Sequence, residues 1–161
     1  MDAQTLSTLL WRERELLELM IFKLEEEHLL LTAGKSRWLE HATREVEQVM
    51  GRLRDAGLSR TVAVAALATE WDTNEDATLR ELVAHAPAGP WAEILASHLQ
   101  AMTELTGQIK ELRDINEQFL RAAARSTQET LARIDVDART YDARGASDSS
   151  LVGAQLVDKS L

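Results

Sequence analysis

The sequence predicts an all-α fold, and three observations support that class. Leu, Ala, Glu, Arg and Gln favour helices and are abundant, whereas only 4% of the residues are aromatic. Apolar residues recur at spacings of three and four over long stretches, as on one face of a helix. Glycine and proline separate these stretches. We predict an elongated antiparallel helical bundle or coiled coil, with two long helices first, short middle helices and one long closing helix.

The first helix is predicted from about Thr5 to Leu31. Leucine recurs every seven residues along it, at Leu10, Leu17, Leu24 and Leu31. This spacing is typical of a long amphipathic helix. Gly34 can adopt the left-handed conformation that ends a helix.

A second helix is predicted from Ser36, as its N-cap, to about Ala56. Trp38, Ala42, Val46, Val49 and Leu53 form its apolar stripe. Gly57 stands where a terminating glycine is expected. Because the connection after the first helix is short, the two helices should pack as an antiparallel hairpin.

The middle of the chain predicts two short helices. One covers Thr61 to Trp71, and the other follows a cap at Thr73 or Asn74 and turns Leu79 and Leu82 inward. The segment 87–90, Pro-Ala-Gly-Pro, then interrupts the helical pattern, and its second proline suits the first turn of the next helix.

The closing helix is predicted from Trp91 to about Ile134. Its seam alternates spacings of three and four, at Leu95, His98, Met102, Leu105, Ile109, Leu112, Asn116, Phe119, Ala123, Ser126 and Thr130. Such a helix spans roughly 65 Å, more than the ~40 Å diameter of a compact domain of this length. The seam residues become small after Phe119, so the distal third buries little area. It should fray or lie against a partner.

The chain is predicted to divide into a helical domain, residues 1–137, and a flexible tail, residues 138–161. A change in composition begins near Asp135, and a small polar tract covers residues 146–150. Tyr141, the sole tyrosine, falls in this tail. As a large amphipathic side chain it is a candidate contact for a partner.

Composition excludes several function classes. The formal net charge of −9 argues against binding to nucleic acid or to anionic membranes. The sequence shows neither the features of a secretion signal nor an apolar stretch long enough to span a membrane. We therefore expect a cytoplasmic protein. There is no cysteine, glycine-rich phosphate loop or nucleophile elbow. We therefore expect no enzyme and no cofactor.

Isolated polar residues have plain structural interpretations. Glu25 and His28 form one Glu-x-x-His pair, but a di-iron site needs two such pairs, so no metal is expected. His98 should be a hydrogen-bonded core residue and His41 exposed. Asn116 interrupts an apolar seam, where it either fixes register within the bundle or caps a bound segment, and the structural role is favoured. The tryptophans are expected to anchor the core.

Five segments resemble the FlgN family of flagellar export chaperones. Residues 10–19 (LWRERELLEL) and 23–31 (KLEEEHLLL) are similar to its opening helix, and residues 82–95 resemble the entry to its closing helix. Residues 115–120 (INEQFL) look like the Asn-bearing stretch of that helix, and residues 140–145 (TYDARG) are similar to its tail signature. One departure is Arg54-Asp55-Ala56-Gly57, where members often carry a Glu and Arg pair.

The resemblance implies a dedicated chaperone for hook–filament junction proteins. It would hold the C-terminal helical segments of these hook-associated proteins and deliver them to the flagellar type III export gate. The residues independently suit this role, since a helix with an uncovered seam can capture another amphipathic helix.

The predicted contact residues for cargo lie on the distal closing helix and in the tail: Asn116, Phe119, Leu120, Ala123, Thr127, Leu131, Ile134 and Tyr141. Tyr141 is assigned either to the cargo or to the export gate. The alternative function is a structural coiled-coil or adaptor protein without export cargo that self-associates, for instance as a homodimer, through the same seam.

Overall fold

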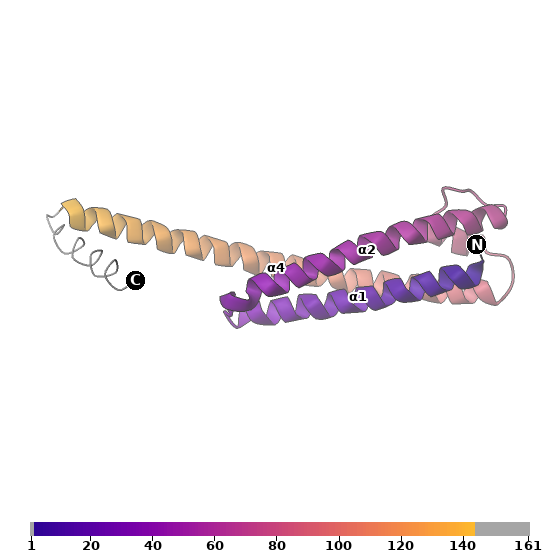
Figure 1. The fold of residues 1–161 in the computed structure, drawn as a ribbon, viewed down its shortest axis with the longest axis horizontal. Coiled ribbons are helices and arrows are strands. Elements are labelled where there is room, and N and C mark those ends of the chain that lie inside the picture. The colour runs from indigo at the N-terminus through magenta and orange to yellow at the C-terminus, as the bar shows by residue number, and fades with distance from the viewer. Residues whose placement is uncertain (1, 144–161) are drawn as a thin grey trace, which may run out of the picture. The chain divides into compact units, whose positions relative to one another are not determined.

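Helices joined by short connections make up the part of the chain that the structure describes. The computed structural model describes residues 2–143. Its helices are α1 (Ala3–Thr32), α2 (Ser36–Glu70), α3 (Leu79–Ala84) and α4 (Pro90–Ala143), and these residues include no strand (Figure 1). The predicted all-α class and the order of long, short and long helices are confirmed.

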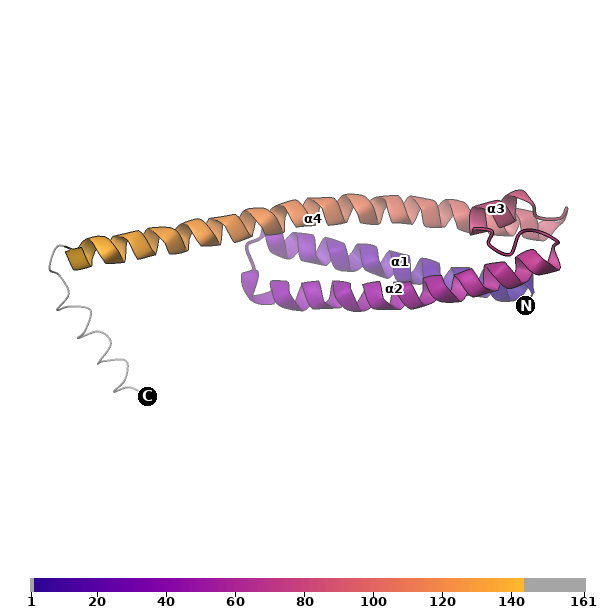
Figure 2. The same cartoon turned by 90° about the horizontal axis from the view of Figure 1, so that it is seen from above.

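The packing divides the chain into one unit of residues 1–119 and a second unit that starts at Leu120. Within the first unit, α1, α2 and residues 90–119 of α4 lie alongside one another, and α3 lies beside the C-terminal end of α2 (Figure 2). The hairpin makes α1 and α2 antiparallel. Contacts of Ser7 with His98 and of Leu24 with Asn116 show that α1 and α4 run in the same direction.

Local signals set both ends of α1 close to the predicted positions. The Asp2 side chain accepts a hydrogen bond from the Thr5 backbone N–H at 2.8 Å and caps the first turn. At the other end, Gly34 has a φ of 66°, and the Lys35 N–H donates to the Leu30 carbonyl at 2.9 Å. This is the Schellman pattern, and it confirms the predicted glycine stop.

Helix α2 corrects the prediction of two separate helices. It begins at Ser36 with Lys35 at the N-cap, and it continues through Gly57 to Glu70. Glycine in a helix costs about 1 kcal/mol relative to alanine. Burial of Val64 and Leu67 beyond it stabilises by about 1.5–3 kcal/mol each, so packing outweighs the glycine.

The middle segment also differs from its prediction. Thr78, and not Thr73 or Asn74, caps the short helix α3, and Glu81 completes a capping box with it. Leu79 and Leu82 are buried, as predicted. Helix α4 begins at Pro90, the expected first-turn proline.

Helix α4 ends at Ala143, beyond the predicted end at Ile134. The helix therefore includes residues 138–143, which the prediction assigns to the tail. The sequence there lacks a strong apolar stripe but still consists of residues compatible with a helix. Tyr141 is accordingly a helical residue. The rest of the predicted tail, residues 144–161, lies outside the described residues.

The core of the first unit is built from leucine, methionine, valine and alanine. The large side chains that are fully buried in it include Leu6, Leu10, Met20, Leu24, Leu67, Leu82 and Leu95. Two tryptophans correct our expectation, because Trp11 is 54% exposed and Trp38 is 49% exposed. Trp71 and Trp91 pack partly buried against the core, as predicted.

His98 is a buried, hydrogen-bonded core residue, as predicted. Its Nδ1 accepts from the Arg14 guanidinium at 3.4 Å, and its Nε2 lies 3.1 Å from the Ser7 hydroxyl. Because arginine can only donate, the ring is neutral with its proton on Nε2. Burial first, and the Arg14 charge second, lower the pKa of His98 below its ordinary value of 6.5.

This lowered pKa predicts an acid-dependent loss of stability. Below about pH 6.5 the unfolded chain takes up a proton on His98 before the folded chain does, so the free energy of unfolding decreases as the pH falls. Urea titrations at pH 7.5 and 5.5 should show a larger decrease in wild type than in His98→Gln. The exposed His41→Gln is the control, and an equal decrease in wild type and His98→Gln would contradict the prediction.

Candidate partner-binding site

An uncovered apolar face lies on residues 120–141 of α4. Counting from Leu120, the spacings are four, three, four, three, four and three, which is the pattern of a coiled-coil seam. We call this the distal face, and its members are Leu120, Ala124, Thr127, Leu131, Ile134, Ala138 and Tyr141.

Three of the four large side chains of the distal face are open to solvent, and the fourth, Leu120, is half-buried. Leu131 is 61% exposed, Ile134 is 59% exposed and Tyr141 is 68% exposed. All the residues from 121 to 141 are exposed, so this segment adds little to the buried core. An exposed apolar face of this length is typical of a site for another chain.

The structure brings together five of the eight predicted contact residues. Leu120, Thr127, Leu131, Ile134 and Tyr141 share the distal face, and Ala123 lies at its edge. Asn116 and Phe119 belong to the first unit.

Ala124 and Ala138 are members of the distal face that sequence analysis missed. We had continued the seam of the first part of α4 through Phe119 to Ala123. The spacing of the sequence indicates both alanines. Alternating steps of three and four back from Tyr141 pass through Ile134 and Leu131 and reach Leu120, not Phe119.

Thr127 fits an apolar interface despite its hydroxyl group. Its Oγ1 donates to the Ala123 carbonyl, one turn earlier, at 3.0 Å. When a partner covers Thr127, the hydroxyl group therefore still has the Ala123 carbonyl as its acceptor.

Asn116 is the centre of a buried polar cluster that joins the helices of the first unit. It is 1% exposed, and its Nδ2 donates to the Leu24 carbonyl at 2.9 Å and to Glu27 Oε1 at 3.0 Å. His28 Nδ1 donates to its Oδ1 at 3.0 Å. The other oxygen of Glu27 accepts from the Thr43 hydroxyl of α2 at 2.9 Å. These contacts support the structural interpretation of Asn116.

Phe119 is held in the first unit by α1. Its ring is 41% exposed and makes an edge-to-face contact with His28, with the ring centroids 5.3 Å apart. Substitution of Phe119 would therefore disturb the packing of α1 with α4 as well as any partner.

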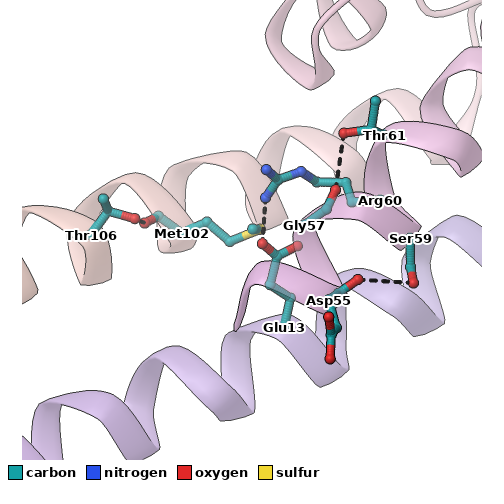
Figure 3. Close-up of polar contacts among 8 residues, drawn as sticks. All are labelled: Glu13, Asp55, Gly57, Ser59, Arg60, Thr61, Met102 and Thr106. Carbon is teal, nitrogen blue, oxygen red and sulfur yellow. Dashed lines mark hydrogen bonds and ion pairs between the residues drawn. The ribbon is translucent and has the colours of Figure 1, made fainter. Parts of the chain in front are cut away.

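A hollow in the first unit lies between α2, the connection to α3, the start of α3, and α4. Its volume is about 730 Å³, and apolar side chains such as Val64, Leu99 and Met102 line it together with Arg60. Figure 3 shows Arg60 paired with Glu13 beside Met102. The hydroxyl groups of Thr61 and Thr106, on the walls, donate to carbonyls of their own helices.

The ion pair at this hollow joins α1 to α2. Arg60 Nη1 lies 2.5 Å from Glu13 Oε1, while Glu13 Oε2 is buried and has no hydrogen-bond partner among residues 2–143. Burial raises the pKa of Glu13, and the Arg60 charge partly opposes that effect. The pair holds α1 and α2 together.

Within residues 2–143, no three His, Asp or Glu side chains group so that they could hold a metal ion. Among the helices described, none combines the length and apolar character that crossing a membrane requires.

The fold and the distal face define an all-helical bundle protein with an uncovered apolar helix face. The chain belongs to the FlgN family: the family model described as FlgN protein matches residues 1–149. It is thus a member of a family of flagellar export chaperones, which act in flagellum assembly and protein export. Membership of this family implies binding of hook-associated proteins. No curated protein and no solved structure gives a significant match.

Proposed function

We propose that the chain binds the C-terminal helical segments of hook–filament junction proteins in the cytoplasm and delivers them to the flagellar export gate. The observation that carries this proposal is the distal face, an apolar seam on residues 120–141 in which Leu131, Ile134 and Tyr141 are each more than half exposed. Membership of the FlgN family supplies the class of cargo.

The composition of the distal face suits a carrier that releases its cargo. Leu131 and Ile134 can each contribute about 1.5–3 kcal/mol when a partner helix covers them. Ala124, Thr127 and Ala138 between and beside them bury little area and let the partner backbone come close. Such an interface gives moderate affinity with few strong anchors.

Light scattering coupled to size exclusion tests the proposal directly. Mixing the chain with the C-terminal segment of a hook–filament junction protein should give a complex of defined stoichiometry. A chain that forms a dimer or larger species alone, and that fails to bind such a segment, would instead support the self-associating adaptor.

Tyr141 extends the distal face near the end of α4, so its partner needs a separate test. A Tyr141→Ala variant should be measured against cargo and against the cytoplasmic domain of the export gate. Loss of cargo affinity assigns Tyr141 to the cargo interface, because its ring is a large exposed anchor on the same face. Retained cargo affinity with loss of gate binding assigns it to the gate.

A further inference from the structure

Helix α1 carries a second apolar face in addition to the one in the core. Six exposed residues follow each other at spacings of four and three along it, so they line one side of the helix. We call this the outer face of α1, and it consists of Trp11, Glu15, Glu18, Phe22, Glu25 and Leu29. The core residues Leu10, Leu17 and Leu24 occupy other positions of the helical repeat and are buried.

The apolar members of the outer face are large and open to solvent. Trp11 is 54% exposed, Phe22 is 56% exposed and Leu29 is 66% exposed. A single exposed apolar residue is ordinary on a protein surface. Three large ones aligned on one side of a helix form an anchor row, since aromatic residues are enriched where chains bind one another.

The charged members of the outer face are all acidic. Glu15, Glu18 and Glu25 are exposed, and within residues 2–143 none of them forms an ion pair. Two cations of the chain itself lie against the rings of this face: the Arg14 guanidinium is 4.3 Å from the Trp11 ring centroid, and Lys23 Nζ is 5.3 Å from that of Phe22. The basic groups of a partner would therefore meet the glutamates and not the rings. The outer face therefore combines apolar anchors with unpaired negative charge.

We propose that the outer face of α1 is a docking surface for a basic amphipathic helix of another protein. Leucine-like side chains of that helix would pack between Trp11, Phe22 and Leu29, and its lysine or arginine side chains would pair with the three glutamates. From Trp11 to Leu29 the row extends over roughly 27 Å, which is enough for about five turns of a partner helix. This surface is separate from the distal face, and the proposal does not rest on the cargo assignment.

The charges favour this occupant over the other candidates. A second copy of the chain would bring two sets of three glutamates together, and like charges at such short range are destabilising. Nucleic acid and anionic lipid surfaces are repelled for the same reason. A neutral apolar helix would leave the carboxylates beside its apolar surface without partners.

Two synthetic helices of about 20 residues test the proposal with the full chain. Both carry leucine at the seam positions, but one has lysine and the other glutamate at the flanking positions. Fluorescence anisotropy should show binding of the lysine helix that weakens as salt is added. Trp11→Ala/Phe22→Ala should lower its affinity at least about tenfold.

Charge reversal gives the sharper measurement. Glu15→Lys/Glu18→Lys/Glu25→Lys should lose affinity for the lysine helix by about tenfold or more and gain affinity for the glutamate helix. The control variant Glu47→Lys/Glu70→Lys/Glu111→Lys changes the net charge equally at exposed positions outside the outer face and should keep the wild-type preference. Circular dichroism confirms that each variant is folded.

Several results would overturn the proposal. The proposal fails if the lysine helix does not bind, or if both helices bind equally well. It also fails if the two triple variants have equal effects. A dimer of the chain that Trp11→Ala/Phe22→Ala converts to a monomer would overturn it too. Binding should persist in Leu131→Asp/Ile134→Asp, and loss there would place the helix on the distal face. Because cargo binding is measured on separate variants, failure of either proposal is distinguishable from failure of the other.

Discussion

Replacing both Leu131 and Ile134 by aspartate is expected to abolish cargo binding and leave the fold intact. The substitutions remove two apolar anchors and place two charges where a partner helix must exclude water. We expect a loss of affinity of at least about 100-fold, or about 3 kcal/mol. Because both side chains are about 60% exposed, helicity and Tm should stay near wild type. Isothermal titration calorimetry and circular dichroism provide the two readouts.

Val136→Asp is the matched control for this experiment. Val136 is 59% exposed, as Ile134 is, and it lies two residues along the same helix on another side. Cargo affinity should therefore be unchanged in this variant. If Val136→Asp weakened binding as much as the double variant, the distal face would not be the contact surface.

The second large effect is expected at Asn116, in the stability of the first unit. Asn116→Leu removes the partner of the Leu24 carbonyl, of Glu27 Oε1 and of His28 Nδ1 in a buried environment. The Leu24 carbonyl keeps its hydrogen bond within α1, but Glu27 Oε1 and His28 Nδ1 lose this partner, which should cost about 3 kcal/mol. For a chain of this size, that lowers Tm by roughly 10 °C, as measured by thermal denaturation.

Two further variants show whether the polar cluster is responsible. Gln108→Leu, at an exposed position of α4, should change stability by less than about 0.5 kcal/mol. Adding Glu27→Leu to Asn116→Leu should recover part of the loss, because an apolar pair replaces a stranded carboxylate. A change of about 0.5 kcal/mol corresponds to a Tm shift of about 1–2 °C. If the Tm of Asn116→Leu stayed within that range of wild type, the polar cluster would contribute little to the free energy of unfolding.

The elements predicted best from sequence are those that local chemistry decides. Gly34 ends α1 because glycine readily takes the positive φ of this position. Pro90 begins α4 because proline has no backbone N–H and the first position of a helix needs none. Asp2 was missed as the N-cap of α1, so the predicted start at Thr5 was late by half a turn. Boundaries of this kind depend on a few neighbouring residues, so a single sequence contains most of the information.

The elements predicted worst are those that packing decides. Gly57 has the sequence character of a helix end, but burial of Val64 and Leu67 against α1 extends α2 through it. The continuing stripe Leu53, Gly57, Arg60, Val64 and Leu67 contained this information, since its spacings of three and four are never interrupted. We had given the local glycine signal more weight than the periodic one.

The candidate site was only partly predictable for a related reason. Leu131, Ile134 and Tyr141 enter the candidate site from sequence because large apolar residues in a polar segment are conspicuous, and their role as partner contacts stays a prediction. Trp11 was assigned to the core, since a tryptophan is usually buried and sequence alone does not show that α1 has more apolar residues than one face can bury.

The exposure of residues 121–141 has a consequence for how the protein can change over evolution. Under the proposed function, substitutions at Leu131, Ile134 or Tyr141 alter what the distal face recognises with little effect on the free energy of folding, because these side chains take little part in the core. Stability and recognition are then encoded in different parts of the sequence. Cargo preference could diverge, or be redesigned, by exchanging a few residues of one helix while the bundle that carries it stays the same.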